Sequence, residues 1–151
     1  MCSSIIELKP EDFNKCSAIW DVRKQSALAE KFYDELLSGN RRTYIFTDDN
    51  NYIAEISLVY DMNDSDYTIP NQRAYVSHLI VKSECREKGI GRQMVDYICK
   101  VAAEEGYQEL SIGVDLDNYP AIKLYSDAGF NKIIKADADQ QGTYLKLMKK
   151  I

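Results

Sequence analysis

The sequence predicts an α/β fold, in which helical and strand patterns alternate along one domain. A chain of 151 residues with 45% hydrophobic content suits a single domain with an ordinary core. Residues 74–105 contain an apolar strand pattern, a short polar loop and an amphipathic helix pattern, in that order. No internal repeat, low-complexity tract or linker divides the chain. We therefore expect one domain over residues 1–151.

The N-terminal half predicts a strand, two helices and a hairpin. Pro10 suits a helix start, and apolar residues recur at helical spacing from Phe13 to Trp20. Gly39 suits a helix end, and the polar residues 48–51 suit a tight turn. The expected elements are a strand at residues 5–8, helices at 10–22 and 27–37, and strands at 43–47 and 52–60. The polar segment from there to Gln72 is the least regular part and a candidate cover for a substrate.

Residues 74–105 predict a strand, a loop and a helix N-terminus that together suit an anion. The apolar run up to Val81 indicates a strand over residues 74–81. Gly89 and Gly91 permit positive φ angles and a close approach of the backbone to a ligand. Arg86 and Lys88 add positive charge. Because the first N–H groups of a helix and its dipole favour negative charge, we expect a pyrophosphate to bind here.

The C-terminal part predicts a strand, a capped helix and two closing strands. Asn118 can cap the helix, Pro120 lies in its first turn, and Gly129 can close it in the left-handed conformation. The expected strands cover residues 109–114, 132–135 and 143–148.

Two motifs are similar to the signatures of the GNAT superfamily of N-acetyltransferases. Arg86-Glu87-Lys88-Gly89-Ile90-Gly91 resembles Arg/Gln-x-x-Gly-x-Gly/Ala, which cradles the pyrophosphate of acetyl-coenzyme A in that family. Residues 118–130 resemble the second signature, Asn-x-x-Ala-x-x-Leu-Tyr-x-x-x-Gly-Phe. The resemblance is strong over residues 74–135 and depends on element order elsewhere. It implies the GNAT fold, a central mixed β-sheet with helices on both faces. It also implies direct transfer of an acetyl group from acetyl-coenzyme A to a primary amine, either of a small molecule or of a protein.

The resemblance also implies which residues bind acetyl-coenzyme A. The strand before the loop would offer main-chain groups, and the loop and helix start would surround the diphosphate. The cofactor-binding residues implied in this way are Leu79, Ile80, Val81, Arg86, Lys88, Gly89, Ile90, Gly91, Arg92 and Asn118. Burial of both strand faces explains the apolar run at residues 79–81 equally well.

Acetyl transfer requires a neutral amine and a proton for the departing thiolate. A lysine-type amine is neutral in only one of ~2,500 molecules at pH 7, so a base, or a site that disfavours the ammonium form, must help. The resemblance implies Tyr125 as the general acid. Relatives often carry the base on the strand before the loop, which holds no carboxylate here. The two candidates for the base are His78 and, on the preceding strand, Glu55. In a regular strand, His78 lies on the face opposite to Ser77.

Composition limits the partners. A net charge of −5 argues against nucleic acid and permits a cationic amine. We interpret the acidic residues 60–66 and 136–139 as solvated loops, with a polyamine site as the alternative. No apolar run approaches the ~18 residues of a membrane span and no signal pattern begins the chain, so a cytoplasmic protein is expected. Four cysteines without C-x-x-C spacing and a single histidine predict no metal site.

Two other functions stay open at this point. One is a catalytically silent acyl-coenzyme A sensor or interaction module on the same fold, which the missing strand carboxylate favours. The other is a nucleotide- or phosphate-binding α/β domain, which leaves the second signature unexplained. The sequence does not give the acceptor amine or the oligomeric state, for which a homodimer is one alternative.

Overall fold

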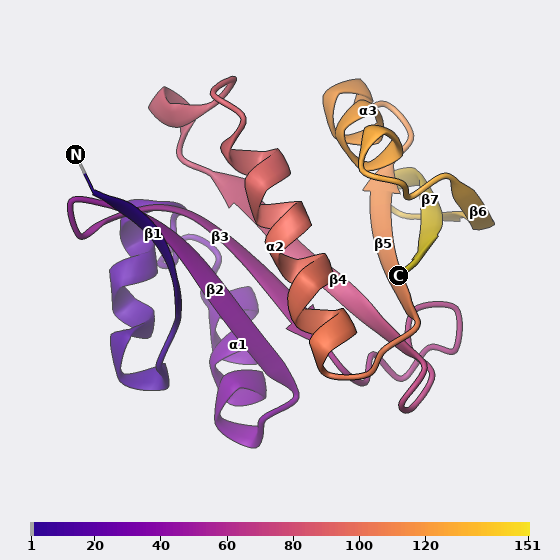
Figure 1. Cartoon of the computed structure of the whole chain (residues 1–151), viewed down its shortest axis with the longest axis horizontal. Coiled ribbons are helices and arrows are strands. Elements are labelled where there is room, and N and C mark those ends of the chain that lie inside the picture. The colour runs from indigo at the N-terminus through magenta and orange to yellow at the C-terminus, as the bar shows by residue number, and fades with distance from the viewer. Residues whose placement is uncertain (1) are drawn as a thin grey trace. The chain divides into compact units, whose positions relative to one another are not determined.

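The computed structural model describes residues 2–151 and contains a mixed sheet of seven strands in the order β1-β2-β3-β4-β5-β7-β6 (Figure 1). Its elements are β1 (Ser3–Glu7), η1 (Pro10–Ala18), α1 (Ser26–Ser38), β2 (Arg41–Asp48), β3 (Asn51–Val59), β4 (Arg73–Val81), η2 (Ser83–Cys85), α2 (Ile90–Glu104), β5 (Glu109–Asp115), α3 (Tyr119–Asp127), β6 (Lys132–Asp139) and β7 (Gly142–Lys150). β4 pairs with β5 in parallel, and the pairs β1–β2, β2–β3, β5–β7 and β6–β7 are antiparallel. This mixed sheet confirms the predicted α/β class.

The structure consists of two compact units. The first contains the chain up to Val59 together with Ser77–Met94, and the second contains Tyr60–Val76 and Val95–Ile151. β4 and α2 each begin in one unit and end in the other. The single domain over residues 1–151 stays an expectation.

In the first unit, η1 and α1 pack against β2 and β3. The buried side chains that form this core are Leu8, Cys16, Trp20, Ala29, Phe32, Ile45 and Tyr52. Ile45 on β2 is paired with Glu55 on β3, and paired residues share one face of a sheet. Glu55 therefore faces the same apolar layer as Ile45. At the turn between the two strands, Asp49 and Asn50 both have positive φ angles, which confirms the predicted hairpin.

The first helical segment differs from the prediction. An α-helix over residues 10–22 was expected, whereas η1 is a 3₁₀ helix that ends at Ala18. A 3₁₀ helix has three residues per turn, so side chains three positions apart lie above one another. Phe13, Cys16 and Ile19 have this spacing, and Cys16 is fully buried. The apolar spacing that predicted an α-helix is therefore also compatible with a 3₁₀ helix that buries the same side.

In the second unit, β5, β7 and β6 are neighbouring strands, and α3 lies beside the carboxyl end of β5 (Figure 1). Asn118 caps α3 by accepting a hydrogen bond from Ala121 N, at 3.3 Å, and Gly129 has a φ of +102°. Both features were predicted. Residues 136–139 were expected to form a solvated loop, but they belong to β6, which pairs with β7 as far as Asp139.

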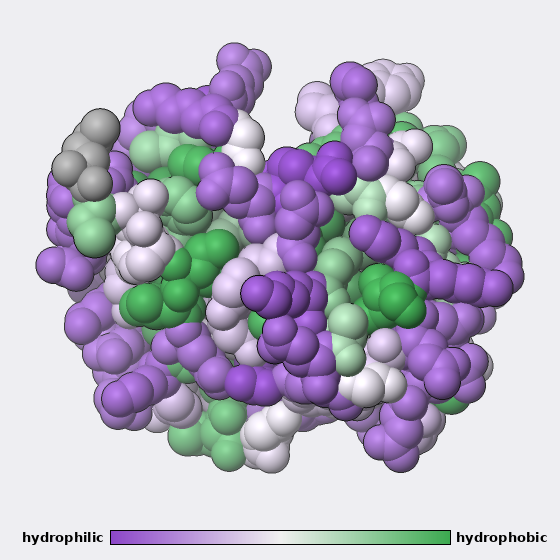
Figure 2. Space-filling model, in the orientation of Figure 1, coloured by the Kyte–Doolittle hydropathy of each residue, from purple (hydrophilic) through white to green (hydrophobic). Residues whose placement is uncertain are grey.

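The face drawn in Figure 2 carries its hydrophobic residues in small separate groups among hydrophilic ones. Over residues 2–151, no helix is long and apolar enough to cross a membrane. Nor do any three His, Cys, Asp or Glu side chains of that part of the chain gather in a way that could hold a metal ion.

Candidate functional site

The backbone between β4 and α2 is shaped for a close ligand. Gly89 has a φ of +80°, and no atom lies within 4 Å of the position that its Cβ would take. Glu87 also has a positive φ, +63°, which the sequence did not predict. Gly91, in contrast, is the second residue of α2 and is not among the described residues with positive φ, so that part of the expectation is wrong. Backbone N–H groups at the start of α2 point out of the helix end, where they suit an anion.

Two hydrogen bonds fix this loop to strands, and two of its side chains offer exposed positive charge. Arg86 Nε donates a hydrogen bond to the Val81 carbonyl at 3.0 Å, which folds the loop back on the end of β4. Lys82 N donates to the Ile53 carbonyl at 2.9 Å. The Arg86 and Lys88 side chains are exposed. An open glycine, exposed cations and a helix N-terminus fit the diphosphate of acetyl-coenzyme A.

The remaining residues predicted to bind the cofactor have structural roles as well. Leu79, Ile80 and Val81 are partly buried, and Ile80 packs against the core of the first unit. The Asn118 side chain serves as the α3 cap. Their contacts with a cofactor stay predictions.

The two candidates for the general base contact each other. His78 Nδ1 lies 3.1 Å from Glu55 Oε2, and Trp20 Nε1 donates to Glu55 Oε1 at 2.6 Å. Glu55 is 2% exposed, so its carboxylate is buried between these two partners. Cys16 also faces this carboxylate. Burial, with Glu55 nearby and hydrogen-bonded to the thiol, raises the pKa of Cys16 well above its ordinary value, which keeps the thiol protonated.

Aromatic rings fix the orientation of the His78 imidazole. Its centroid lies 4.8 Å from the Trp20 ring and 4.9 Å from the Phe32 ring, both in edge-on geometry. The Arg41 guanidinium covers the Phe32 ring, with its Cζ at 3.7 Å from the ring centroid. If the Glu55 carboxylate accepts a hydrogen bond from Nδ1–H, the lone pair of a neutral imidazole is on Nε2. In that tautomer Glu55 orients the imidazole and Nε2 of His78 is the accepting nitrogen.

β4 is irregular at His78, and this changes the face on which the side chain lies. His78 has a φ of +57°, in the left-handed region, and the two residues before it are both buried. Ser77 Oγ accepts a hydrogen bond from Arg41 Nη2 at 3.0 Å, while His78 contacts Glu55. Arg41 and Glu55 lie on the same face of the β2–β3 pair. Neighbouring residues of a regular strand alternate between faces, so the expectation that His78 faces away from Ser77 is wrong.

Tyr125, the predicted general acid, lies in the second unit and lines a cavity of about 350 Å³. Its side chain is 8% exposed. Burial, with a smaller effect of Tyr75, raises the pKa of Tyr125 to about 12. The phenol is therefore protonated at physiological pH. Tyr67, Tyr75 and Tyr144 line the same cavity, which we call the tyrosine cavity, and none of these three was predicted as a site residue.

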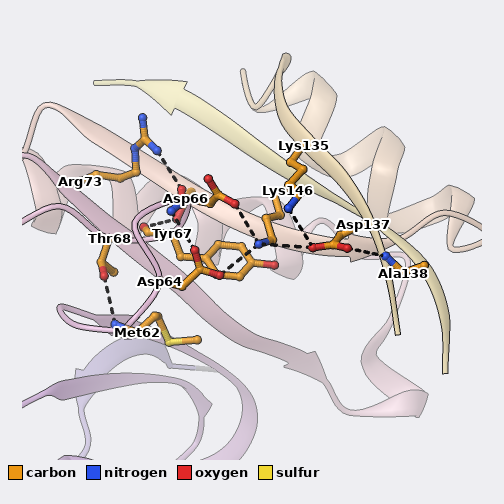
Figure 3. Close-up of polar contacts among 11 residues, drawn as sticks. Met62, Asp64, Asp66, Tyr67, Thr68, Arg73, Lys135, Asp137, Ala138 and Lys146 are labelled. Atoms are coloured by element: carbon orange, nitrogen blue, oxygen red, sulfur yellow. Dashed lines mark hydrogen bonds and ion pairs between the residues drawn. The ribbon is translucent and has the colours of Figure 1, made fainter. Parts of the chain in front are cut away.

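A buried lysine contacts Tyr67, one of the residues that line the tyrosine cavity. Lys146 Nζ lies 3.0 Å from Asp64 Oδ2 and 3.0 Å from Asp66 Oδ2, and 4.9 Å from the centroid of the Tyr67 ring (Figure 3). Burial would lower the pKa of Lys146, but the two aspartates raise it well above its ordinary value. The interpretation of residues 60–66 as a solvated loop is thus wrong for Asp64 and Asp66, which fix this segment to β7. The sequence gives no signal for this contact, because the partners are about eighty positions apart.

Comparisons with known proteins agree on one family. The sequence model described as the acetyltransferase (GNAT) family matches residues 4–130. Human N-acetyltransferase 8 is 30% identical over 77 residues, which are 51% of this chain and 34% of that protein. The chloroplastic GCN5-related N-acetyltransferase 4 of Arabidopsis thaliana is 37% identical over 60 residues, 40% of this chain and 21% of that protein. This chain thus matches about a third or less of the length of these curated relatives.

Solved structures share the fold over the full chain. The aminoglycoside 6'-N-acetyltransferase from Enterococcus faecium superimposes with a TM-score of 0.76 at 17% identity, covering 99% of this chain and 97% of that one. The PaiA N-acetyltransferase from Thermoplasma acidophilum, in complex with coenzyme A, gives a TM-score of 0.71 at 18% identity, with full coverage of both chains.

Proposed function

The chain belongs to the GNAT family of acetyltransferases, and on this premise we propose that it transfers the acetyl group of acetyl-coenzyme A to a primary amine by direct attack. The observation that supports catalysis best is the Trp20–Glu55–His78 arrangement. The buried Glu55 carboxylate is hydrogen-bonded to the Trp20 indole through one oxygen and to the His78 imidazole through the other. A silent binding module has no need for such an arrangement. Acetyl-coenzyme A supplies the activated acyl group, as a thioester.

The loop residues 86–91 and the start of α2 would bind the diphosphate of the cosubstrate. Gly89 provides open backbone, and Arg86 and Lys88 provide charge. The backbone of residues 79–81 is the proposed partner of the pantetheine arm, and one of its N–H groups would stabilise the carbonyl oxyanion.

His78 is the proposed general base. Nε2 would take the proton of the attacking amine, and the Glu55 carboxylate would stabilise the imidazolium that forms. Glu55 itself is unsuited to direct contact with a substrate, because it is 2% exposed and its two oxygens are already engaged. Its role in the proposal is to position His78.

Tyr125 is the proposed proton donor. As the amine nitrogen bonds to the acetyl carbon, the C–S bond breaks, and the thiolate receives a proton from the Tyr125 hydroxyl. A pKa of about 12 makes complete transfer to a thiolate of pKa ~8.5 unfavourable by about 5 kcal/mol. Hydrogen bonding to the developing negative charge therefore carries most of the effect, and water resupplies the proton.

Titration calorimetry with acetyl-coenzyme A, followed by a thiol-release assay over a panel of primary amines, tests this function. Gly89→Ala and Gly39→Ala form a matched pair, because both glycines have positive φ and open space around the absent Cβ. We expect Gly89→Ala to weaken binding and Gly39→Ala to leave it unchanged. If the wild type does not bind acetyl-coenzyme A, the proposal fails. If it binds without acetylating any amine, the silent acyl-coenzyme A sensor replaces it.

A further inference from the structure

We propose that the tyrosine cavity binds the second cationic group of the acceptor, and that this acceptor is a small aliphatic diamine. This inference deepens the proposed function and rests on it. The residues that line the cavity include four tyrosines and two aspartates, namely Tyr67, Tyr75, Tyr125, Tyr144, Asp115 and Asp139. Asn118, a predicted cofactor-binding residue, also lines it. Its volume of about 350 Å³ is near the lower end of small-molecule pockets, which suits a short aliphatic chain.

The charges of the residues that line the tyrosine cavity indicate which class of ligand it binds. Among the described residues that line the cavity, none is Lys, Arg or His. Neither Asp115 nor Asp139 takes part in any ion pair that the structure records among residues 2–151. Tyrosine rings attract cations through their π faces, and the attraction grows as water is excluded. The aromatic rings, together with two carboxylates that form no ion pair, favour an ammonium group over a neutral or acidic ligand.

The neighbours of Tyr67 fix the position of its ring in the tyrosine cavity. Its ring centroid lies 4.6 Å from that of Tyr75, and its hydroxyl lies 2.7 Å from the position of a Cβ on Gly113. Only glycine at position 113 lets the phenol lie this close to β5. Lys146 lies over the Tyr67 ring and fixes the segment through Asp64 and Asp66 (Figure 3). The positive charge of Lys146 is thus balanced by two carboxylates and does not repel a cation from the cavity.

Three amines of equal chain length test the charge requirement: 1,4-diaminobutane, 1-aminobutane and 4-aminobutanoate. We expect kcat/KM for the diamine to exceed that for 1-aminobutane by about tenfold, with 4-aminobutanoate the poorest substrate, since each exposed carboxylate contributes a few-fold. Higher salt should reduce the preference for the diamine, because exposed charges are screened. Equal kcat/KM values for the three amines would overturn the inference while leaving acetyl transfer intact.

Variants of the cavity residues test which side chains cause the preference for the diamine. The double variant Asp115→Asn and Asp139→Asn should lose most of the preference for the diamine. Asp117→Asn is the matched control, because Asp117 is exposed two residues from Asp115 but does not line the cavity. Tyr144→Leu, which removes a ring, should raise KM for the diamine about three-fold.

Calorimetry with 1,4-diaminobutane alone separates this inference from the proposed function. Binding that the double variant loses and Asp117→Asn retains supports the cation site, even if no amine is acetylated. In that case the proposed function fails, and only the cation-binding part of the inference survives. If the double variant binds the diamine as tightly as the wild type does, the assignment of the cavity to a cationic ligand is wrong.

Discussion

His78 is the single histidine of the sequence, and its imidazole contacts a carboxylate that is fixed by an indole N–H. Glu55→Gln tests whether this contact sets the tautomer. The amide side chain of this variant can accept from Trp20 through its oxygen and donate from its nitrogen to His78 Nδ1, which moves the imidazole proton to Nε2. We expect Glu55→Gln and His78→Gln each to lower kcat/KM by about 10²-fold, within the range of general base catalysis.

Nitrogen NMR measures the tautomer directly, because one histidine gives one pair of imidazole signals. The wild type should show an unprotonated Nε2, and Glu55→Gln should show an unprotonated Nδ1. Cys16→Ala is the control: Cys16 also faces Glu55, and its loss should leave both the tautomer and kcat/KM unchanged. An unaltered tautomer in Glu55→Gln would remove the positioning role from Glu55.

Tyr125→Phe removes only the hydroxyl that the proposed reaction uses. We expect kcat to fall by about 10²-fold, because a donor to the developing thiolate is lost. Calorimetry should show little change in the Kd for acetyl-coenzyme A, since the proposed diphosphate site is at residues 86–91. A variant with the wild-type kcat would show that another group supplies the proton.

The same variant tests burial of the phenol through stability. The pKa of Tyr125 is about 12 in the folded protein and ~10 in an unfolded chain. A raised folded pKa contributes stability that is complete below pH ~10 and is lost as the pH rises through 12. Urea unfolding at pH 9, 10 and 11 should therefore show the wild type losing up to about 1.4 kcal/mol more than Tyr125→Phe between pH 10 and 11. Parallel pH curves would mean that the phenol is solvated.

At the level of elements, sequence periodicity predicted most strands and helices, because alternation and capping are local properties. The cap at Asn118 and the left-handed Gly129 followed from residues within one turn of them. The 3₁₀ geometry of η1 did not, although the three-residue spacing from Phe13 to Ile19 contained the signal. The irregularity of β4 at His78 was not predicted either. It allows Ser77 and His78 to contact residues of other strands, and no local sequence preference indicates it.

The segment between β3 and β4 is fixed by Lys146, so Lys146→Met should release it. Lys146 is 5% exposed, whereas Asp64 and Asp66 are 37% and 33% exposed, so part of each interaction is screened by water. We expect the free energy of unfolding to fall by about 1–3 kcal/mol, since two carboxylates lose their shared cation. Urea unfolding measures this loss. Lys135→Met is the control, because Lys135 is 54% exposed and its loss should cost less than about 0.5 kcal/mol.

Acid titration adds a second measurement on this lysine. The pKa of Asp64 is lowered, first by the Asp66 backbone N–H and then by Lys146, against the opposing effect of burial. A lowered folded pKa contributes stability above the ordinary value of ~3.9 that is lost as the pH falls. Lys146→Met should therefore destabilise less in acid than at pH 7, while the backbone contribution of Asp66 persists. Equal destabilisation at both pH values would mean that the lysine acts through packing and not through charge.

Across the whole molecule, the motifs that identified the family are contiguous in sequence, whereas the contacts that define the candidate site are not. Glu55 lies 35 residues from Trp20 and 23 from His78. Their association depends on strand order and register, which a single sequence does not give. Nothing in the sequence distinguished Tyr67, Tyr75 and Tyr144 from the other tyrosines among its 11. Only the fold of the second unit shows that they line one cavity.

The shared elements predict that the chain unfolds as one cooperative body. β4 and α2 begin in one unit and end in the other, so loss of either unit breaks a strand and a helix of its neighbour. Trp20, the single tryptophan, is buried in the first unit and reports on it, and Lys146→Met perturbs the second. We expect this variant to shift the urea midpoint of Trp20 fluorescence and that of far-ultraviolet circular dichroism equally. An unchanged Trp20 midpoint beside a lowered dichroism midpoint would show that the two units unfold independently.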